Sequence, residues 1–212
     1  GSSCTSDWGK VDPPAGIQTA PNLENVATFE FEEDMLDPLI LRAYGSQDQI
    51  PSIVEDELKG KVLELNDGWV EMNNPLNNVN CEKAASLTFW MKQAVPEEDE
   101  DASAFEQDVT GAIFSFENAN STQRMFFTAN GWLNYEGVDG SYEDNNPADA
   151  KTGLMSAGEW HYVAISIKNN GYFVYVDGLK KIEKTVSDFD CSKIVQFMAS
   201  VPYLYIGYRS NT

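Results

Sequence analysis

Carboxylate side chains are the groups in this sequence that could most readily do chemistry, because the chain carries 34 Asp and Glu residues. Hydrolysis of a glycosidic bond needs two such groups flanking the bond. The densest acidic runs are Glu32 to Asp37, which leads into Pro38, and Glu97 to Asp101, which has no apolar framing. Neither run resembles acids held on a packed strand. We therefore predict solvated charge in both runs and no catalytic residue in the chain.

The single histidine, His161, narrows the other catalytic and metal-binding options. One histidine cannot form a histidine-based metal cluster, and acid–base catalysis would need a nearby partner. Its place in an alternating apolar run favours a packed or hydrogen-bonded structural role. Asp177-Gly178 favours a hairpin turn, because glycine accepts positive φ and aspartate can bond to the local backbone.

Aromatic side chains near turns are the better candidates for a ligand site. Sugars stack their C–H faces on aromatic rings, which offer a large contact at low entropy cost. Trp132, Tyr135 and Tyr142 fall on or beside loops, and Trp69 follows the turn Asn66-Asp67-Gly68. We predict these four as ligand-binding residues, with core packing as the alternative. Trp90 and Trp160 look more like core residues.

Calcium is a further candidate ligand, because hard oxygen donors are plentiful and Ca²⁺ prefers them. No spacing among these acids singles out one site, so the sequence predicts at most a structural Ca²⁺. The candidate carboxylates are Asp34, Asp37, Asp67, Asp139 and Asp144.

The charge balance limits the classes of partner. The formal net charge is −20, which disfavours nucleic acid and direct contact with anionic membrane surfaces. Apolar residues make up 42% of the chain and aromatics 12%, enough for a sizeable core. No stretch of about 18 apolar residues occurs, so the sequence predicts no membrane-spanning segment. We expect a monomer.

Three cysteines are an awkward number for a disulfide framework. Cys4 precedes a polar, Pro-rich segment and resembles the lipid-modified first residue of a mature bacterial lipoprotein, whose signal would lie upstream. A leftover thiol is the alternative. Cys81 and Cys191 each precede a strand-like run, which leaves a disulfide between them open.

Short apolar runs separated by turn residues follow from Val26 onward and are typical of stacked antiparallel strands. Residues 1–22 read as a tether, and residues 23–212 as one sandwich domain. No segment shows a convincing helical period over three turns, and Ile53 to Leu58 is the best short exception.

One stretch carries a family resemblance. Gly158-Glu159-Trp160-His161-Tyr162-Val163, followed by Tyr175-Val176-Asp177-Gly178, is similar to the central hairpin of laminin G-like and concanavalin A-like domains. The resemblance extends over roughly residues 26–208. It implies an all-β, two-sheet antiparallel jelly-roll sandwich. That family normally has a further strand after Leu204-Tyr205-Ile206-Gly207, so we expect truncation from a longer parent.

The resemblance implies a function but does not name a ligand. The first hypothesis is a non-catalytic module that binds a polysaccharide or oligosaccharide. It would be part of an exported bacterial surface lipoprotein, held at the outer membrane only through Cys4. The alternatives are a protein-interaction or adhesion domain, and a glycoside hydrolase on the same fold.

Overall fold

The chain folds into antiparallel strands with one short helix, in a computed structural model that describes residues 31, 40–45, 49–95, 111–145 and 153–208. The larger sheet has seven strands in the spatial order β1 (Ile40–Tyr44), β4 (Trp69–Asn73), β13 (Tyr203–Ile206), β6 (Ala112–Glu117), β7 (Arg124–Thr128), β8 (Trp132–Gly137) and β9 (Gly140–Asn145). The smaller sheet has four strands in the order β12 (Leu179–Thr185), β11 (Gly171–Val176), β10 (His161–Lys168) and β5 (Ala84–Met91). The predicted two-sheet jelly-roll sandwich is confirmed.

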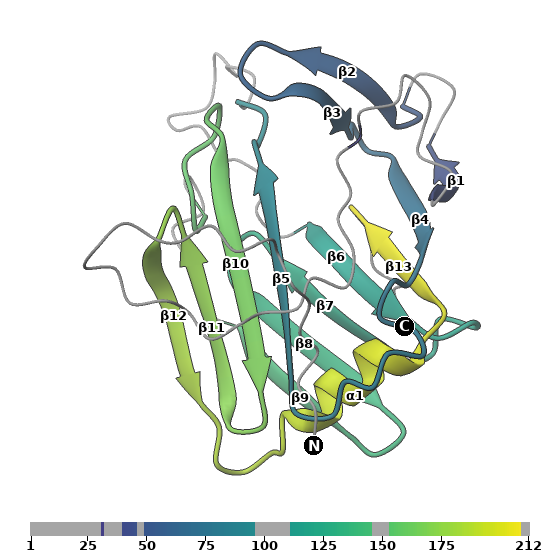
Figure 1. Ribbon diagram of the computed structural model, residues 1–212, viewed down its shortest axis with the longest axis vertical. Coiled ribbons are helices and arrows are strands. Elements are labelled where there is room, and N and C mark those ends of the chain that lie inside the picture. The colour runs from purple at the N-terminus through teal and green to yellow at the C-terminus, as the bar shows by residue number, and fades with distance from the viewer. Residues whose placement is uncertain (1–30, 32–39, 46–48, 96–110, 146–152, 209–212) are drawn as a thin grey trace, which may run out of the picture.

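The two sheets face each other as layers, with β12, β11, β10 and β5 in front in Figure 1 and β6 to β9 behind. A separate two-stranded hairpin, β2 (Ser52–Asp56) and β3 (Gly60–Glu64), lies at one end of the sandwich. Helix α1 (Ser192–Ser200) lies at the opposite end. The apolar side of this helix is buried and includes Ile194, Val195 and Met198. The sequence did not predict this helix. Ile53, the first residue of the best helical candidate in the sequence, belongs to strand β2 instead.

The core fills the space between the sheets because apolar residues alternate along the strands. On β10, Val163, Ile165 and Ile167 are fully buried, as the alternation predicts. Phe89 of the smaller sheet meets Phe114 of the larger sheet edge to face, with 6.3 Å between ring centroids. These side chains belong to one continuous apolar cluster.

Two tight connections shape the smaller sheet. Asp177 and Gly178 both have positive φ, +52° and +79°, so the predicted hairpin turn is confirmed. Gly171 opens β11 with φ +147°, and a β-carbon there would collide with the carbonyl oxygen of Lys184. A glycine is therefore needed for the chain to pass this close to β12.

Of the remaining expectations, one is contradicted by the structure and others lie outside the residues that it describes. Cys191 is a buried free thiol, so a disulfide between Cys81 and Cys191 does not form. Cys4 and the predicted boundary at residue 22 lie outside the described residues. Within the described ranges, no helix is both long and apolar enough to cross a membrane.

Candidate functional site

The larger sheet buries polar side chains on the face that points away from the core. Strand β6 shows the division clearly. Phe114 and Phe116 belong to the apolar core, whereas Ser115 and Glu117 alternate with them and point to the opposite face. All four are buried. Buried acids and hydroxyls on the outer face of a sheet need a reason, because burial of polar groups is costly unless they are bonded.

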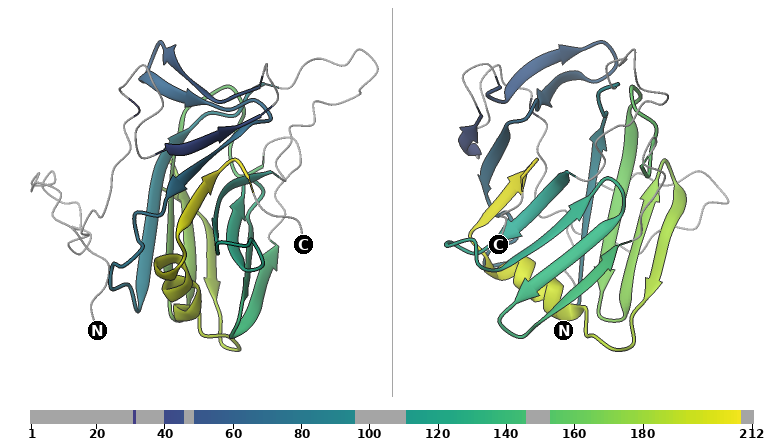
Figure 2. Two further views of the ribbon diagram at one scale, coloured as in Figure 1. Left: turned by 90° about the vertical axis from the view of Figure 1, so that its right-hand side faces the viewer. Right: turned by 180° about the vertical axis from the view of Figure 1, so that it is seen from behind.

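Strand register arranges these residues in two lines across the sheet, which we call the polar face. Figure 2 (right) views the sheet from this outer side. The first line consists of Glu71, Tyr205, Ser115, Phe126, Asn134 and Glu143. The second line consists of Asn73, Tyr203, Glu117, Arg124, Glu136 and Ser141.

A chain of aromatic rings runs along one side of the polar face, and we call it the aromatic row. Tyr44 stacks on Trp69 at 5.1 Å between ring centroids, and Trp69 stacks on Tyr208 at 4.7 Å. Tyr208 then meets Tyr205 at 5.3 Å, and Tyr205 meets Tyr203 at 6.4 Å. All five rings are half-buried, so each keeps part of its surface open.

Both acids beside the aromatic row accept hydrogen bonds from neighbouring hydroxyl groups. The Tyr44 hydroxyl donates to Glu71 Oε2 over 2.8 Å, and the Ser115 hydroxyl donates to Glu117 Oε2 over 3.0 Å. Burial, and then the negative charges of Glu71 and Glu117, raise the pKa of the Tyr205 phenol far above its ordinary value. Tyr205 therefore stays a neutral hydroxyl at physiological pH, able to donate and accept hydrogen bonds.

Two of the four predicted ligand residues lie on this outer face. Trp69 is part of the aromatic row, and Trp132 lies on β8, where its ring meets Phe126 edge to face at 5.0 Å. Four strand-to-strand steps separate β4 from β8, or about 19 Å at a spacing of about 4.8 Å per step. The two tryptophans thus flank the polar face without touching.

The other two predicted residues lie on the inner side of the sheet, and the expectation for them needs correction. Tyr135 alternates with Trp132 and Asn134 on β8, so its ring is in the core, 2% exposed, against Phe197. Tyr142 is partly buried against the same core and stacks on Phe189 at 5.5 Å. Neither ring shares a surface with Trp69 or Trp132, because neighbouring residues on a strand point to opposite faces.

Trp90 was expected in the core, but it is 51% exposed on the outer face of the smaller sheet. Lys59 Nζ lies 3.2 Å above its ring centroid, and Tyr162 packs beside it at 5.2 Å. Trp160 is half-buried and donates from Nε1 to Asp56 over 3.0 Å. Because the Trp90 ring face is already covered by an ammonium group, it is a poorer sugar platform than the aromatic row.

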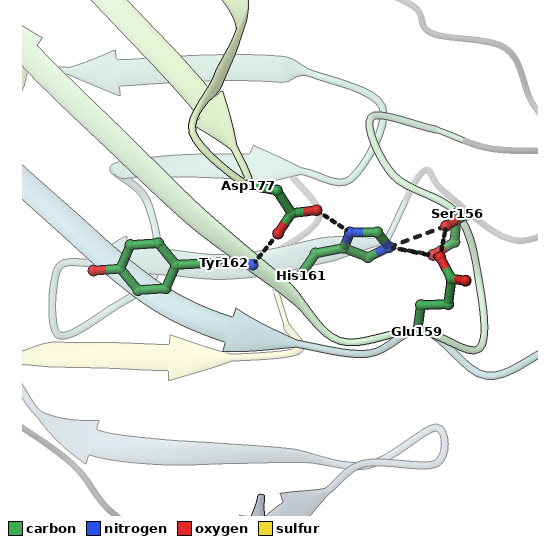
Figure 3. Close-up of polar contacts among 5 residues, drawn as sticks. All are labelled: Ser156, Glu159, His161, Tyr162 and Asp177. Atoms are coloured by element: carbon green, nitrogen blue, oxygen red, sulfur yellow. Dashed lines mark hydrogen bonds and ion pairs between the residues drawn. The ribbon is translucent and has the colours of Figure 1, made fainter. Parts of the chain in front are cut away.

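Ser156, His161 and Asp177 lie in a line that resembles a nucleophile–base–acid arrangement (Figure 3). His161 Nδ1 is 2.6 Å from Asp177 Oδ2, and Nε2 is 3.1 Å from Ser156 Oγ. The exposed Ser156 hydroxyl, however, donates over 2.7 Å to Glu159 Oε2, and Nε2 is also 3.0 Å from the Ser156 carbonyl oxygen. The serine proton is thus drawn towards Glu159 rather than held for the histidine.

The same contacts explain what this cluster does for the fold. Asp177 Oδ1 also accepts a hydrogen bond of 2.9 Å from the Tyr162 backbone N–H, so its carboxylate ties the β11–β12 turn to the start of β10. His161 is 8% exposed and connects that turn to the Ser156 loop. The structural role predicted for His161 is confirmed, and we call these contacts the histidine latch.

The predicted calcium ligands do not converge where they are described. Asp67 accepts a hydrogen bond from Gln49, Asp139 from Tyr135, and Asp144 from Tyr172. Asp34 and Asp37 lie outside the described residues. In the part of the chain that the structure describes, no group of three His, Cys, Asp or Glu side chains could hold a metal ion.

The residues that sequence reasoning missed are those whose significance depends on strand pairing. Glu71, Glu117 and Arg124 are single charges in otherwise apolar strands. A charge on the buried side of such a strand is a usable signal, because it must be bonded or be functional. Tyr44 and Tyr208 are single tyrosines outside the turns considered for ligand contact, and their local sequence carries no such signal.

No protein-family model matches this chain, and no curated protein sequence matches it. Among solved structures it is similar to domain 4 of an extracellular GH43 arabinanase from Geobacillus stearothermophilus, determined with arabinotriose. Identity there is 17%, over 76% of this chain and 68% of that one, with a TM-score of 0.48. Mouse laminin α1 domains LG4-5 match at 17% identity over 68% and 32%, with a TM-score of 0.44.

A Bacillus licheniformis β-glucanase matches at 14% identity over 79% of this chain and 81% of that one, with a TM-score of 0.31. The chain spans about a third of the laminin pair. All three TM-scores are below 0.5, so these matches carry no argument about ligand or activity, which is left to the residues themselves.

Proposed function

We propose that this chain is a non-catalytic carbohydrate-binding module whose ligand lies along the aromatic row. The observation that carries the proposal is the continuous contact of five half-buried rings, Tyr44 to Tyr203, beside a sheet face of polar side chains. A sugar chain has apolar C–H faces and hydroxyl edges. The rings match the faces, and a few fixed polar groups match the edges.

Binding is favoured over hydrolysis by the state of the two nearest acids. Glu71 and Glu117 each already accept a hydrogen bond from a neighbouring hydroxyl. They lie two strands apart and one two-residue step out of line. Both are also buried, Glu71 at 7% and Glu117 at 0% exposed, so neither is placed to flank a glycosidic bond.

Glycoside hydrolysis is the second candidate, because two carboxylates on one aromatic-lined face are what that reaction uses. Incubating the chain with each polysaccharide that it binds, and measuring new reducing ends, separates the two functions. We expect none above the level of a Glu71→Gln and Glu117→Gln double variant. Formation of reducing ends by the unaltered chain but not by the double variant would establish that the protein is an enzyme.

The binding test is affinity electrophoresis and calorimetry against a panel of soluble polysaccharides. We expect Trp69→Ala to weaken binding at least about tenfold, because it removes the ring that stacks on both Tyr44 and Tyr208. Trp90→Ala is the matched control, since it removes an exposed tryptophan from the opposite side of the sandwich. Equal affinities of the two variants, or no binding by the unaltered chain, would contradict the proposal.

The setting of the module is also part of the proposal: an exported bacterial surface protein held at the outer membrane through a lipid on Cys4. The supporting features are the position of Cys4 ahead of a polar, Pro-rich segment and the net charge of −20. Palmitate labelling of the full-length precursor tests it. Label that persists in a Cys4→Ser variant would exclude this anchor.

A further inference from the structure

We propose that strand β5 is the contact through which two copies of this chain associate, edge to edge, about a two-fold axis. The strand is the last one of the smaller sheet, and among the described residues it pairs only with β10. Within that part of the chain, its other edge presents backbone N–H and C=O groups without a ladder partner. Such groups can pair with a strand from a second molecule.

The other three outer strands of the two large sheets carry features that discourage such pairing. Strand β12 has the sequence LKKIEKT, with four charged side chains, and its register with β11 contains an irregularity. Strand β9 carries Glu143 and Asp144, and the register of β1 is shifted against β4. Charges and bulges are the usual protection of a free edge against pairing with other chains.

Strand β5 carries none of these features. Its eight residues read AASLTFWM, without a charge, a proline or a glycine, and its register against β10 is continuous along the whole strand. The core is also incompletely covered at this edge. Leu87 and Phe89 remain partly exposed, whereas their partners on β10, Ile165 and Val163, are fully buried. A long, regular and uncharged edge beside an open core is a surface that another strand completes.

A second copy of the chain is the partner that matches this edge. The added strand must be uncharged and apolar at alternate positions, and β5 itself has this pattern, with Leu87 and Phe89 towards the core and Ser86 and Thr88 towards solvent. A two-fold axis perpendicular to the sheet pairs β5 with itself in antiparallel orientation, because such an interface uses the same patch on both copies. With the axis at Thr88, Leu87 of one copy lies opposite Phe89 of the other.

This dimer differs from the monomer that we expected from the sequence, because the position of a strand at a sheet edge is not visible in its local run of residues. The net charge of −20 on each copy opposes association, but β5 itself adds no charge to the contact. Added salt screens the repulsion between the copies. The dimer should therefore strengthen with ionic strength, whereas a dimer held by ion pairs would weaken.

Sedimentation equilibrium of the whole chain over a range of concentrations, at low and high salt, measures the association. Thr88→Lys and Thr88→Glu each place a charge on the exposed outer side of β5. Like charges on adjacent strands repel and opposite charges attract. We therefore expect each variant alone to dimerise at least about tenfold more weakly, and an equimolar mixture of the two to recover the dimer. Thr185→Lys, the same change on the outer strand β12, is the matched control and should dimerise like the unaltered chain.

Thermal unfolding shows that each variant folds, and Ser86→Lys, on the same exposed side of β5, replaces Thr88→Lys if that variant melts earlier. An unaltered chain that stays monomeric at every concentration would overturn the inference. Amide hydrogen exchange would then give the reason, since protected outward amides of β5 would show that another segment of the same chain covers the edge.

Two further results would also overturn the inference. A dimer that persists in both Thr88 variants, or a loss of the dimer that Thr185→Lys shares, would place the contact elsewhere on the molecule. A mixture of the Lys and Glu variants that stays monomeric would contradict the two-fold pairing of β5 with itself. These results are distinct from sugar binding by the aromatic row, which the polysaccharide panel tests.

Discussion

The Tyr44 hydroxyl donates a hydrogen bond of 2.8 Å to Glu71 Oε2, which connects the first ring of the aromatic row to a carboxylate that is only 7% exposed. The contact joins strands β1 and β4 at the edge of the larger sheet. A buried carboxylate depends on such donors, because it has lost the water that would otherwise solvate it.

Replacing Tyr44 with phenylalanine tests this dependence. The ring and its stacking on Trp69 remain, but Glu71 loses its donor, so we expect the free energy of unfolding to fall by about 1–3 kcal/mol. Urea denaturation measures the difference. Tyr203→Phe is the control, because among the described residues the Tyr203 hydroxyl has no hydrogen-bond partner. Equal stability of the two variants would show that Glu71 does not rely on Tyr44.

The histidine latch predicts a specific acid sensitivity. The hydrogen bond with His161 and that from the Tyr162 backbone N–H lower the pKa of Asp177 below its ordinary value of 3.8. A carboxyl group whose pKa is lowered by folding stabilises the protein above its unfolded pKa, and the stabilisation disappears as pH falls through the folded value. We therefore expect Asp177→Asn to be less stable than the unaltered chain at neutral pH. Below about pH 4 the difference in stability between the variant and the unaltered chain should disappear. Chemical denaturation from pH 2 to pH 7 measures it, and a gap that persists at the acidic end would disprove this linkage.

The aromatic row predicts the opposite behaviour in alkali. Burial, with the charges of Glu71 and Glu117, raises the pKa of Tyr205 above its ordinary value of 10.0. A group whose pKa is raised by folding stabilises the protein below its unfolded pKa, and that contribution is lost as pH rises through the folded value. Above pH 10 the unaltered chain should therefore lose more stability than Tyr205→Phe. Ultraviolet titration of the phenolate gives an independent measurement, since Tyr205 should ionise only on unfolding. Early ionisation at pH 10 in the folded protein would count against the predicted burial.

Asp56 anchors the separate β2–β3 hairpin to the rest of the sandwich. Its Oδ1 accepts hydrogen bonds from the Leu58 and Lys59 backbones, each 2.9 Å, and from Trp160 Nε1 over 3.0 Å. We expect Asp56→Ala to accelerate amide hydrogen exchange across residues 52–64 and leave the core strands protected, because β2 and β3 pair only with each other. Glu55→Ala, an exposed acid on the same strand, is the control. Uniform acceleration through β10 and β11 would instead point to global destabilisation.

Local patterns predicted the strands well and the helix not at all. The run from Trp160 to Gly178 alternates with a period of two and ends in a turn that needs glycine, so β10, β11 and their connection could be read directly. Helix α1 has only nine residues and no side-chain N-cap hydrogen bond. Its stability comes from packing its apolar side onto the end of the sandwich, which is a tertiary effect.

The predicted ligand residues on strand β8 show the same contrast between local sequence pattern and tertiary packing. Trp132 and Tyr135 both lie on β8, three residues apart and equally aromatic. One ring lies on the outer face and the other in the core. Alternation indicates that they must differ, but the neighbouring layer determines which face is the inner one.

By itself, the sequence determined a two-layer antiparallel sandwich, its central hairpin, the structural role of His161 and an acidic chain with aromatic candidates. These features depend on near neighbours, whose spacing fixes period and turn chemistry. Only the tertiary structure decided that Glu71, Tyr205, Ser115 and Asn134 form one line, because those residues come from four strands distant in the sequence. Strand order and register brought them together, and neither is written in any local run of residues.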